Sequence, residues 1–125
     1  MPYDDLLREK RIQTYRATPA EIKSLLAIAE RDLRTAARNA KEDPDWAYTI
    51  AYNAVLQSAR ALMFSAGYRP RGMEHHATVV RFTEEYLGGK YLDWVAFFDR
   101  MRRTRNRSVY ETGSSRSDCL CPIIC

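Results

Sequence analysis

The sequence predicts an all-α protein, folded as a four- to five-helix up-and-down bundle. Alanine, leucine, arginine and glutamate are abundant, whereas there are only 5 glycines and 5 prolines, which stand mainly between helix-forming segments. Within those segments apolar residues recur at intervals of three and four, which is the spacing of one helix face. No stretch shows the alternation with a period of two that is typical of a strand. With 125 residues, 46% of them hydrophobic, the chain has the length for one domain with a buried core.

The first long helix is expected from residue 18 to about residue 42. Thr18 can cap the helix, Pro19 suits its first position, and Glu21 completes a capping box. One apolar face then follows, made by Ile22, Leu25, Leu26, Ala29, Leu33, Ala36 and Ala40. Residues 1–17 are polar and weakly periodic, so they are expected to form an arm or a short helix.

Three further helices are expected along the chain. Asp43 and Pro44 start the second, and Gly67 ends it. The connection to the first helix is very short, so these two helices should run antiparallel. The third helix is expected over Met73–Leu87, and the fourth begins near Lys90 and continues into a run of arginines.

The bundle is expected to cover residues 18–112, followed by an irregular tail over 113–125 that is atypical for such a fold. The only cysteines, Cys119, Cys121 and Cys125, lie in this tail. A structural zinc ion needs four ligands, and no fourth lies nearby. We therefore expect no metal and no cofactor.

The location expected from the sequence is the cytoplasm. The acidic start, Met-Pro-Tyr-Asp-Asp, does not resemble a signal peptide. No apolar stretch approaches the ~18 residues of a membrane span, so no membrane association is expected. A body without cysteine also suits a reducing compartment.

The fourth helix carries five arginines within eight residues, at Arg100, Arg102, Arg103, Arg105 and Arg107. At about 100° per residue, Arg105 falls in the middle of an apolar stripe formed by Tyr91, Trp94, Val95, Phe97, Phe98 and Met101. Arg100, Arg103 and Arg107 point to the opposite side, where solvent is expected. Arg102, Asn106 and Tyr110 flank Arg105 and would form a polar, basic rim. Such a rim suits phosphate or a nucleotide better than a neutral metabolite.

Two interpretations of Arg105 remain open at this point. Its stem can pack on the core while its head reaches water beyond the end of the bundle. Alternatively, the stripe continues onto a partner chain or a ligand, and Arg105 lines a shared cleft, since an isolated buried charge is very costly.

The chain contains only two histidines, His75 and His76. Because they are adjacent, they point to different faces of a helix, whereas two metal ligands on one helix need a spacing of three or four. We interpret them as a turn residue and a surface residue, with a supporting role near the Arg105 cleft as the alternative. The aromatic residues Trp46, Trp94, Phe97 and Phe98 are assigned to the core and to an interface.

Several segments resemble HEPN domains in their order and spacing. The segment AYNAVLQSARAL at 51–62, followed by GYRPR at 67–71 and by His75-His76, is similar to the second helix and following turn of that family. The segment RNRSVYE at 105–111 resembles the family signature, an arginine followed several residues later by a histidine. The resemblance covers about residues 20–112, and it implies a helical bundle of HEPN type.

The resemblance implies a homodimer that pairs the signature helices of two protomers. It also implies a protein partner, a minimal nucleotidyltransferase, in a toxin–antitoxin or defence module, and binding of RNA or a nucleotide. Arg105 matches the arginine of the family and Asn106 its frequent polar neighbour. Together with Arg102 of the basic rim, they are the residues expected to bind RNA or a nucleotide. The alternative activity is that of a metal-independent endoribonuclease, with Arg105 and Tyr110 as catalytic residues.

The chain departs from the family signature at Tyr110, which stands where the histidine is expected. An imidazole with a pKa of about 6.5 accepts a proton at neutral pH, whereas a phenol with a pKa of about 10 is almost never ionised. The tyrosine therefore predicts reduced or absent ribonuclease activity.

Overall fold

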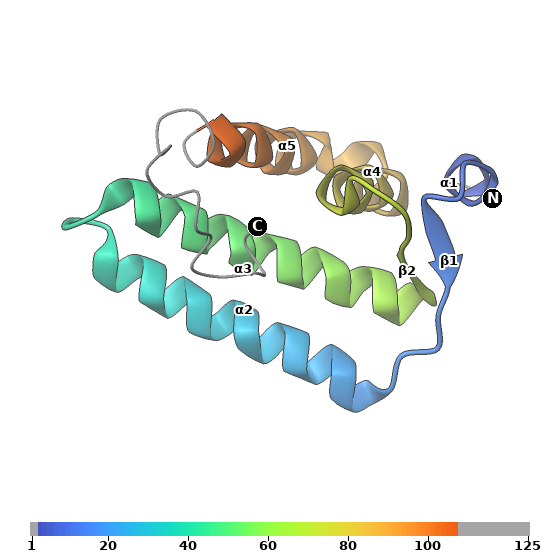
Figure 1. Cartoon of the computed structure of the whole chain (residues 1–125), viewed down its shortest axis with the longest axis horizontal. Helices are drawn as coiled ribbons and strands as arrows, with labels where there is room; N and C mark the ends of the chain where they lie inside the picture. The colour runs from blue at the N-terminus through green and yellow to red at the C-terminus, as the bar shows by residue number, and fades with distance from the viewer. Residues whose placement is uncertain (1–2, 108–125) are drawn as a thin grey trace.

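The computed structural model describes residues 3–107 and has the expected all-α architecture (Figure 1). In chain order its elements are α1 (Asp4–Arg8), β1 (Ile12–Thr14), α2 (Pro19–Asn39), α3 (Pro44–Ala66), β2 (Tyr68–Pro70), α4 (His75–Leu87), a 3₁₀ turn (Gly89–Tyr91) and α5 (Leu92–Arg107). The four long helices correspond to the four that the apolar spacing predicts. The expected tail, residues 113–125, lies outside the described residues.

The first two long helices form an antiparallel hairpin whose ends are set by capping residues. The Thr18 hydroxyl accepts a hydrogen bond from the Glu21 amide at 3.2 Å, and the Glu21 carboxylate accepts one from the Thr18 amide at 3.2 Å. This is the predicted capping box. Asp43 caps α3 by accepting from the amide of Trp46 at 3.1 Å. Gly67 ends α3 with a left-handed φ of 94°, which glycine adopts without strain.

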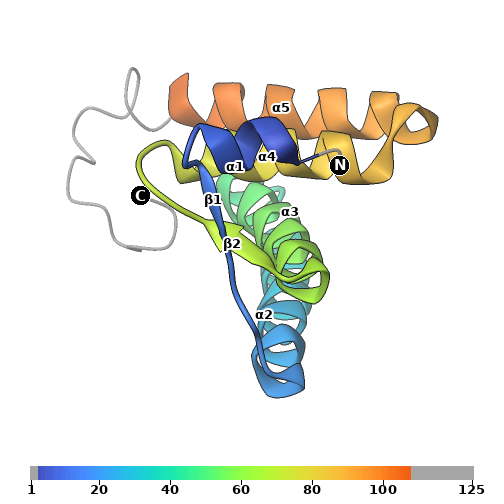
Figure 2. The ribbon, with the colours of Figure 1, turned by 90° about the vertical axis from the view of Figure 1, so that its right-hand side faces the viewer.

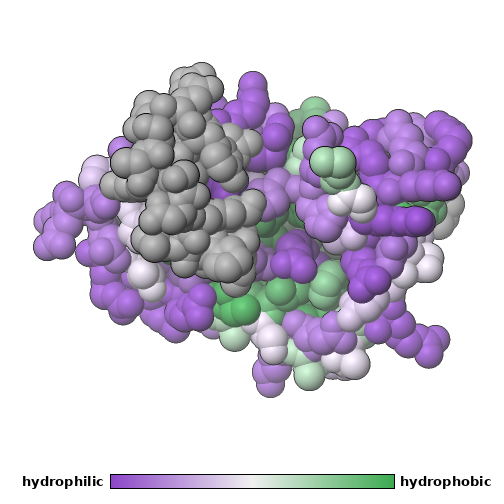
Figure 3. Space-filling model, viewed as in Figure 1, coloured by the Kyte–Doolittle hydropathy of each residue, from purple (hydrophilic) through white to green (hydrophobic). Residues whose placement is uncertain are grey.

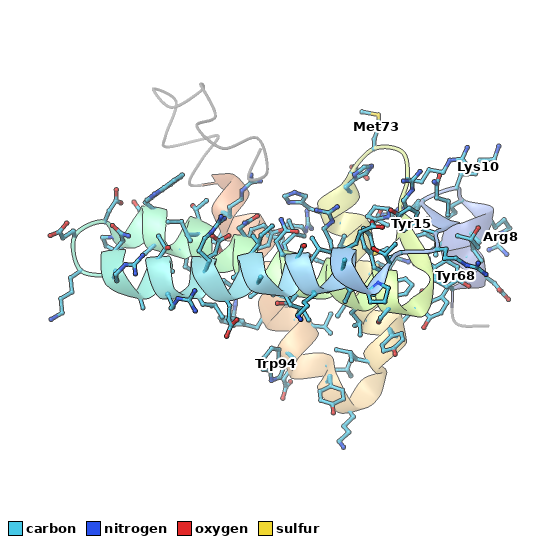
Figure 4. The ribbon with its side chains drawn as sticks, turned by 90° about the horizontal axis from the view of Figure 1, so that it is seen from below. Arg8, Lys10, Tyr15, Tyr68, Met73 and Trp94 are labelled. Atoms are coloured by element: carbon cyan, nitrogen blue, oxygen red, sulfur yellow. The ribbon has the colours of Figure 1, made fainter. Side chains whose placement is uncertain are left out.

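The second pair of long helices lies across the first. Figures 2 and 4 show α4 and α5 side by side and running across the α2–α3 hairpin. Helix α3 contacts α2, α4 and α5, and is therefore the central helix of the fold. Helix α4 begins at His75, two residues later than expected, because Gly72 and Glu74 both take left-handed φ angles, of 78° and 57°. These turns redirect the chain before the helix starts.

A small two-stranded sheet was not predicted. Strands β1 and β2 pair antiparallel, with Gln13 opposite Arg69. Each strand has three residues, which is too short to produce a recognisable alternation in the sequence. The sheet fastens the N-terminal arm to the end of α3 and places the first turn of α4 beside it.

The arm contributes to the core. Leu6 and Ile12 are fully buried, at 0% and 2% exposed, within the same cluster as Met63 and Phe82. The ring of Tyr3 stacks on that of Phe82 with their centroids 4.5 Å apart. Residues 3–14 therefore cover a hydrophobic face that α3 and α4 leave open.

The buried stripe of α5 is narrower than the sequence predicts. It consists of Val95, Phe98, Met101 and Arg105, whereas Trp94 is 72% and Phe97 50% exposed. Figure 4 shows Trp94 projecting on the side of the α2–α3 hairpin opposite to Met73, beyond the helices that would cover it. The first turns of α5 therefore overhang the bundle and present an aromatic surface.

Candidate functional site

Arg105 lies inside the molecule, on the face of α5 that packs against α3. It is 2% exposed, and its guanidinium carbon lies over the ring of Tyr52, 5.9 Å from the ring centre. Its predicted place on the apolar face is confirmed. The burial argues against the interpretation in which the guanidinium reaches freely into water. The interpretation in which Arg105 lines a cleft shared with a partner chain or a ligand stays a prediction. A cation over a phenol ring is a favourable arrangement, most so when it is desolvated.

The ring of Tyr52 joins this arginine to a histidine of α4. The Tyr52 hydroxyl and Nδ1 of His76 are 3.0 Å apart, a hydrogen bond between a fully buried residue and a half-buried one. Our interpretation of His76 as a plain surface residue is wrong, because the structure places it beside the arginine cluster. His75, which precedes it, is exposed.

A signal for the position of His76 was present in the sequence. Val79, Val80 and Thr83 follow it at intervals of three, four and seven, and all three are buried. This is the spacing of one helix face, so His76 belongs to the buried side of α4. The spacing between the two histidines, which was considered only for metal binding, does not reveal this buried position.

The pKa of His76 is lowered by its surroundings. Burial, followed by the charges of Arg105, Arg102, His75 and Arg60, lowers the pKa of His76 to about 4, so its imidazole is neutral at pH 7. Burial also raises the pKa of the Tyr52 hydroxyl well above its usual range, so that it stays protonated. A neutral Tyr–His pair therefore sits among guanidinium groups.

Arg102 lies at the accessible edge of this cluster. Its guanidinium donates two hydrogen bonds to one oxygen of Asp99, at 3.0 and 3.1 Å, and its side chain is 23% exposed. The same carboxylate also faces Arg103, at 3.3 Å, but that side chain is 66% exposed and points outward, as predicted. The single carboxylate of Asp99 thus interacts with both Arg102 and Arg103, so their two positive charges exceed its one negative charge.

Arg60 lies at one end of a row of buried polar side chains that are joined by hydrogen bonds. Its guanidinium donates to Gln57 at 3.1 Å, the Gln57 amide donates to Asn53 at 3.4 Å, and the Asn53 amide donates to Asp32 at 2.7 Å. Arg31 donates two hydrogen bonds to Asp32 from the surface. Buried polar groups linked in this way fix one another's orientation. The row ties α2 to α3 and fixes the guanidinium of Arg60 through Gln57.

The remaining predicted site residues are not placed by the structure. Tyr110 lies outside the described residues. Asn106 belongs to α5, but its side chain lies outside the described part of the chain. Their assigned roles stay predictions, as does the catalytic or binding role of Arg102 and Arg105.

Figure 3 shows the face of the molecule on which α4 begins, with a hydrophobic area between the two helical hairpins and hydrophilic side chains around it.

Within residues 3–107, no group of three or more histidine, cysteine, aspartate or glutamate side chains is arranged to hold a metal ion. None of the helices in that range combines the length and the apolar character required to cross a bilayer.

The comparison with protein families agrees with this architecture. A family model described as HEPN domain matches residues 22–120. The match covers most of the chain, which therefore belongs to the HEPN family. No curated protein and no solved structure gives a significant match.

Proposed function

We propose that the protein is a homodimeric HEPN domain that binds RNA or a nucleotide through phosphate, as the partner of a minimal nucleotidyltransferase in a cytoplasmic toxin–antitoxin or defence module. The observation that carries the binding proposal is the buried guanidinium of Arg105, which lies over the ring of Tyr52, while the Tyr52 hydroxyl is 3.0 Å from Nδ1 of His76. Guanidinium groups match phosphate oxygens in geometry and in charge. A bound phosphate would balance the excess charge of the cluster.

The accessible edge of the site offers a direct test of this proposal. Replacing Arg102 by glutamine is expected to lower the affinity for a short labelled RNA by about 5- to 20-fold, and to reduce the slope of log affinity against log salt by about 0.7. Fluorescence anisotropy between 50 and about 300 mM salt measures both quantities. Arg103→Gln is the matched control, because Arg103 shares Asp99 but points outward. Equal losses for the two variants would argue for a diffuse basic surface instead of a site.

A dependence on pH is expected from His76. Its pKa of about 4 leaves it neutral in the free protein, and a phosphate beside it would favour the protonated form. Binding should therefore take up a proton, and affinity should rise as the pH falls from 7 to about 5. The effect of pH on the folding of the free protein has the opposite sign. Protonation of His76 favours the unfolded chain, so the free energy of unfolding decreases as the pH falls from about 6.5 towards 4.

The pH dependence is checked by repeating the anisotropy titrations at several pH values. His76→Gln should bind RNA with a flatter pH profile, whereas His75→Gln, at the exposed neighbouring position, should keep the wild-type profile. Identical profiles for the wild type and His76→Gln would exclude His76 from the site.

The alternative function is that of a metal-independent endoribonuclease. The Tyr52–His76 pair beside Arg105 supports this alternative, because the site contains an imidazole group that the signature segment lacks. In this alternative Arg105 stabilises the negative charge that develops on the oxygens of the phosphorane, and Tyr110 polarises the 2′-hydroxyl group. We expect the wild type to cleave total RNA weakly or not at all in EDTA, and Tyr110→His to create or raise cleavage.

The control for cleavage is Arg105→Ala in the Tyr110→His background, which should abolish it. If the wild type already cleaves RNA rapidly in EDTA and Tyr110→Phe leaves the rate unchanged, Tyr110 is not the residue that limits the activity.

The aromatic overhang of α5 supports the homodimer. Trp94 and Phe97 are 72% and 50% exposed on neighbouring turns of one side of α5, and such exposed apolar side chains are commonly covered by a partner. Light scattering at tens of micromolar is expected to give twice the 14.5 kDa mass of the chain. A mass of one chain for the wild type would contradict the dimer.

A further inference from the structure

A second basic and aromatic feature lies at the end of α3, next to the two-stranded sheet. The guanidinium of Arg69 lies 4.8 Å from the ring centre of Tyr15. The Tyr15 ring is 5.1 Å from that of Phe64, and Arg60 lies 5.7 Å from the Phe64 ring centre on the preceding turn. Cations and rings thus form a continuous row from β2 to α3.

Several cations of β1, β2 and the segments next to them form no ion pair with a carboxylate of the described residues. Within residues 3–107, no ion pair with a carboxylate involves Lys10, Arg11, Arg16, Arg69 or Arg71. Their neighbours differ, because Arg8 pairs with Asp5 and Arg81 pairs with Glu9 and Glu85. Figure 4 shows Lys10 and Tyr15 at the same end of the molecule. Arg69 and Arg71 are both exposed, so within the described residues their positive charges face solvent without a paired carboxylate.

We propose that Tyr15, Phe64, Arg69 and Arg71 form a second contact for single-stranded RNA, here called the sheet-end surface, and that Arg60 connects it to the Arg105 site. This inference rests on the proposed function and specifies its ligand as an RNA several nucleotides long. Arg60 lies between the two places along α3, about two turns after Tyr52 and one turn before Phe64, and its guanidinium lies over the Phe64 ring.

The distance between the two places sets the length of RNA. Tyr52 and Phe64 are twelve residues apart on one helix, which corresponds to about 18 Å of rise. At ~3.4 Å per nucleotide of a stacked strand, an RNA of about five nucleotides or more spans both places. A dinucleotide reaches only one of them.

The chemistry of the sheet-end surface favours single-stranded RNA over an acidic protein. Proteins that bind single strands combine a basic path with aromatic or guanidinium planes on which bases stack. Arg69 is exposed over the Tyr15 ring and presents such a plane. The Tyr15 hydroxyl donates to Glu21 at 2.5 Å, so the ring, and not the hydroxyl, is what Tyr15 offers to a ligand. An acidic peptide would interact with the positive charges of this surface but would not stack on its aromatic and guanidinium planes.

The test compares RNA lengths in a double variant with a matched control. Arg69→Gln/Arg71→Gln is expected to lower the affinity for a ten-nucleotide RNA by about 10-fold or more, and its salt slope by about 1.4, while leaving dinucleotide binding unchanged. Arg34→Gln/Arg38→Gln removes the same charge from exposed positions on α2 and should change the ten-nucleotide affinity by less than about 2-fold. Thermal unfolding by circular dichroism checks that both variants are folded.

The outcomes separate this inference from the proposed function. If the sheet-end variant binds the ten-nucleotide RNA as the control does, while Arg102→Gln still weakens binding, the sheet-end inference is overturned and the proposed function stands. If an acidic ten-residue peptide competes with the RNA at equal concentration, the surface serves a protein partner and the inference is also overturned. If the wild type binds neither RNA length, the proposed function fails first.

Discussion

Replacing Arg105 by glutamine is expected to lower the affinity for RNA at least about 30-fold, more than any other substitution in the arginine run. The expected loss corresponds to about 2 kcal/mol, the lower end for truncating one partner of a desolvated charge interaction. Arg105 is 2% exposed and lies over Tyr52, so its charge is screened far less by water than that of Arg103. Anisotropy titration of Arg105→Gln beside Arg103→Gln measures the difference.

A second measurement separates a binding role of Arg105 from a structural one. The Arg105 charge is one cause of the low pKa of His76, so Arg105→Gln should raise that pKa in the free protein. NMR titration of the His76 ring protons measures the shift, with His75 as an internal reference. If Arg105→Gln is folded and keeps both the wild-type RNA affinity and the wild-type His76 titration, Arg105 lies outside the site.

Replacing Leu6 by alanine is expected to lower the free energy of unfolding by about 2–5 kcal/mol, a large fraction of the stability of a small domain. Leu6 is 0% exposed in α1, a helix of five residues that has little stability of its own. The loss therefore reflects the burial that the arm provides between α3 and α4. Urea unfolding followed by circular dichroism gives the change in free energy.

The matched control for Leu6 is Leu33→Ala in α2, at a position that is 53% exposed. Its unfolding free energy should change by less than about 1 kcal/mol. Equal stabilities of Leu6→Ala and the wild type would show that the arm is dispensable for folding.

The helical part of the fold was predictable because its signals are local. Thr18 with Glu21, and Asp43 with Pro44, mark helix starts through hydrogen bonds and backbone angles within a few residues of each start. The apolar spacing then gives each helix its buried face. Arg105 was found in the same way, since its angle on α5 depends only on its position along the helix.

The site was only partly predictable because its members meet through the packing of separate helices. The pairing of His76 with Tyr52 depends on α4 lying across α3, and no spacing along the chain encodes that crossing. The two-stranded sheet is similar, because each strand is too short to be detected and forms only where the arm meets the end of α3.

By itself, then, the sequence determined the four long helices, the starts of the first two and the place of Arg105 on the apolar face of the last, all of which arise from positions within about one or two turns. Only the tertiary structure decided that His76 is half-buried and paired with Tyr52 below Arg105, that the arm contributes Leu6 to the core, and that Trp94 stays exposed. The physical reason is the same in each case. Burial and electrostatic environment depend on which surfaces lie opposite one another, and that is fixed by the angle and overhang of packed helices.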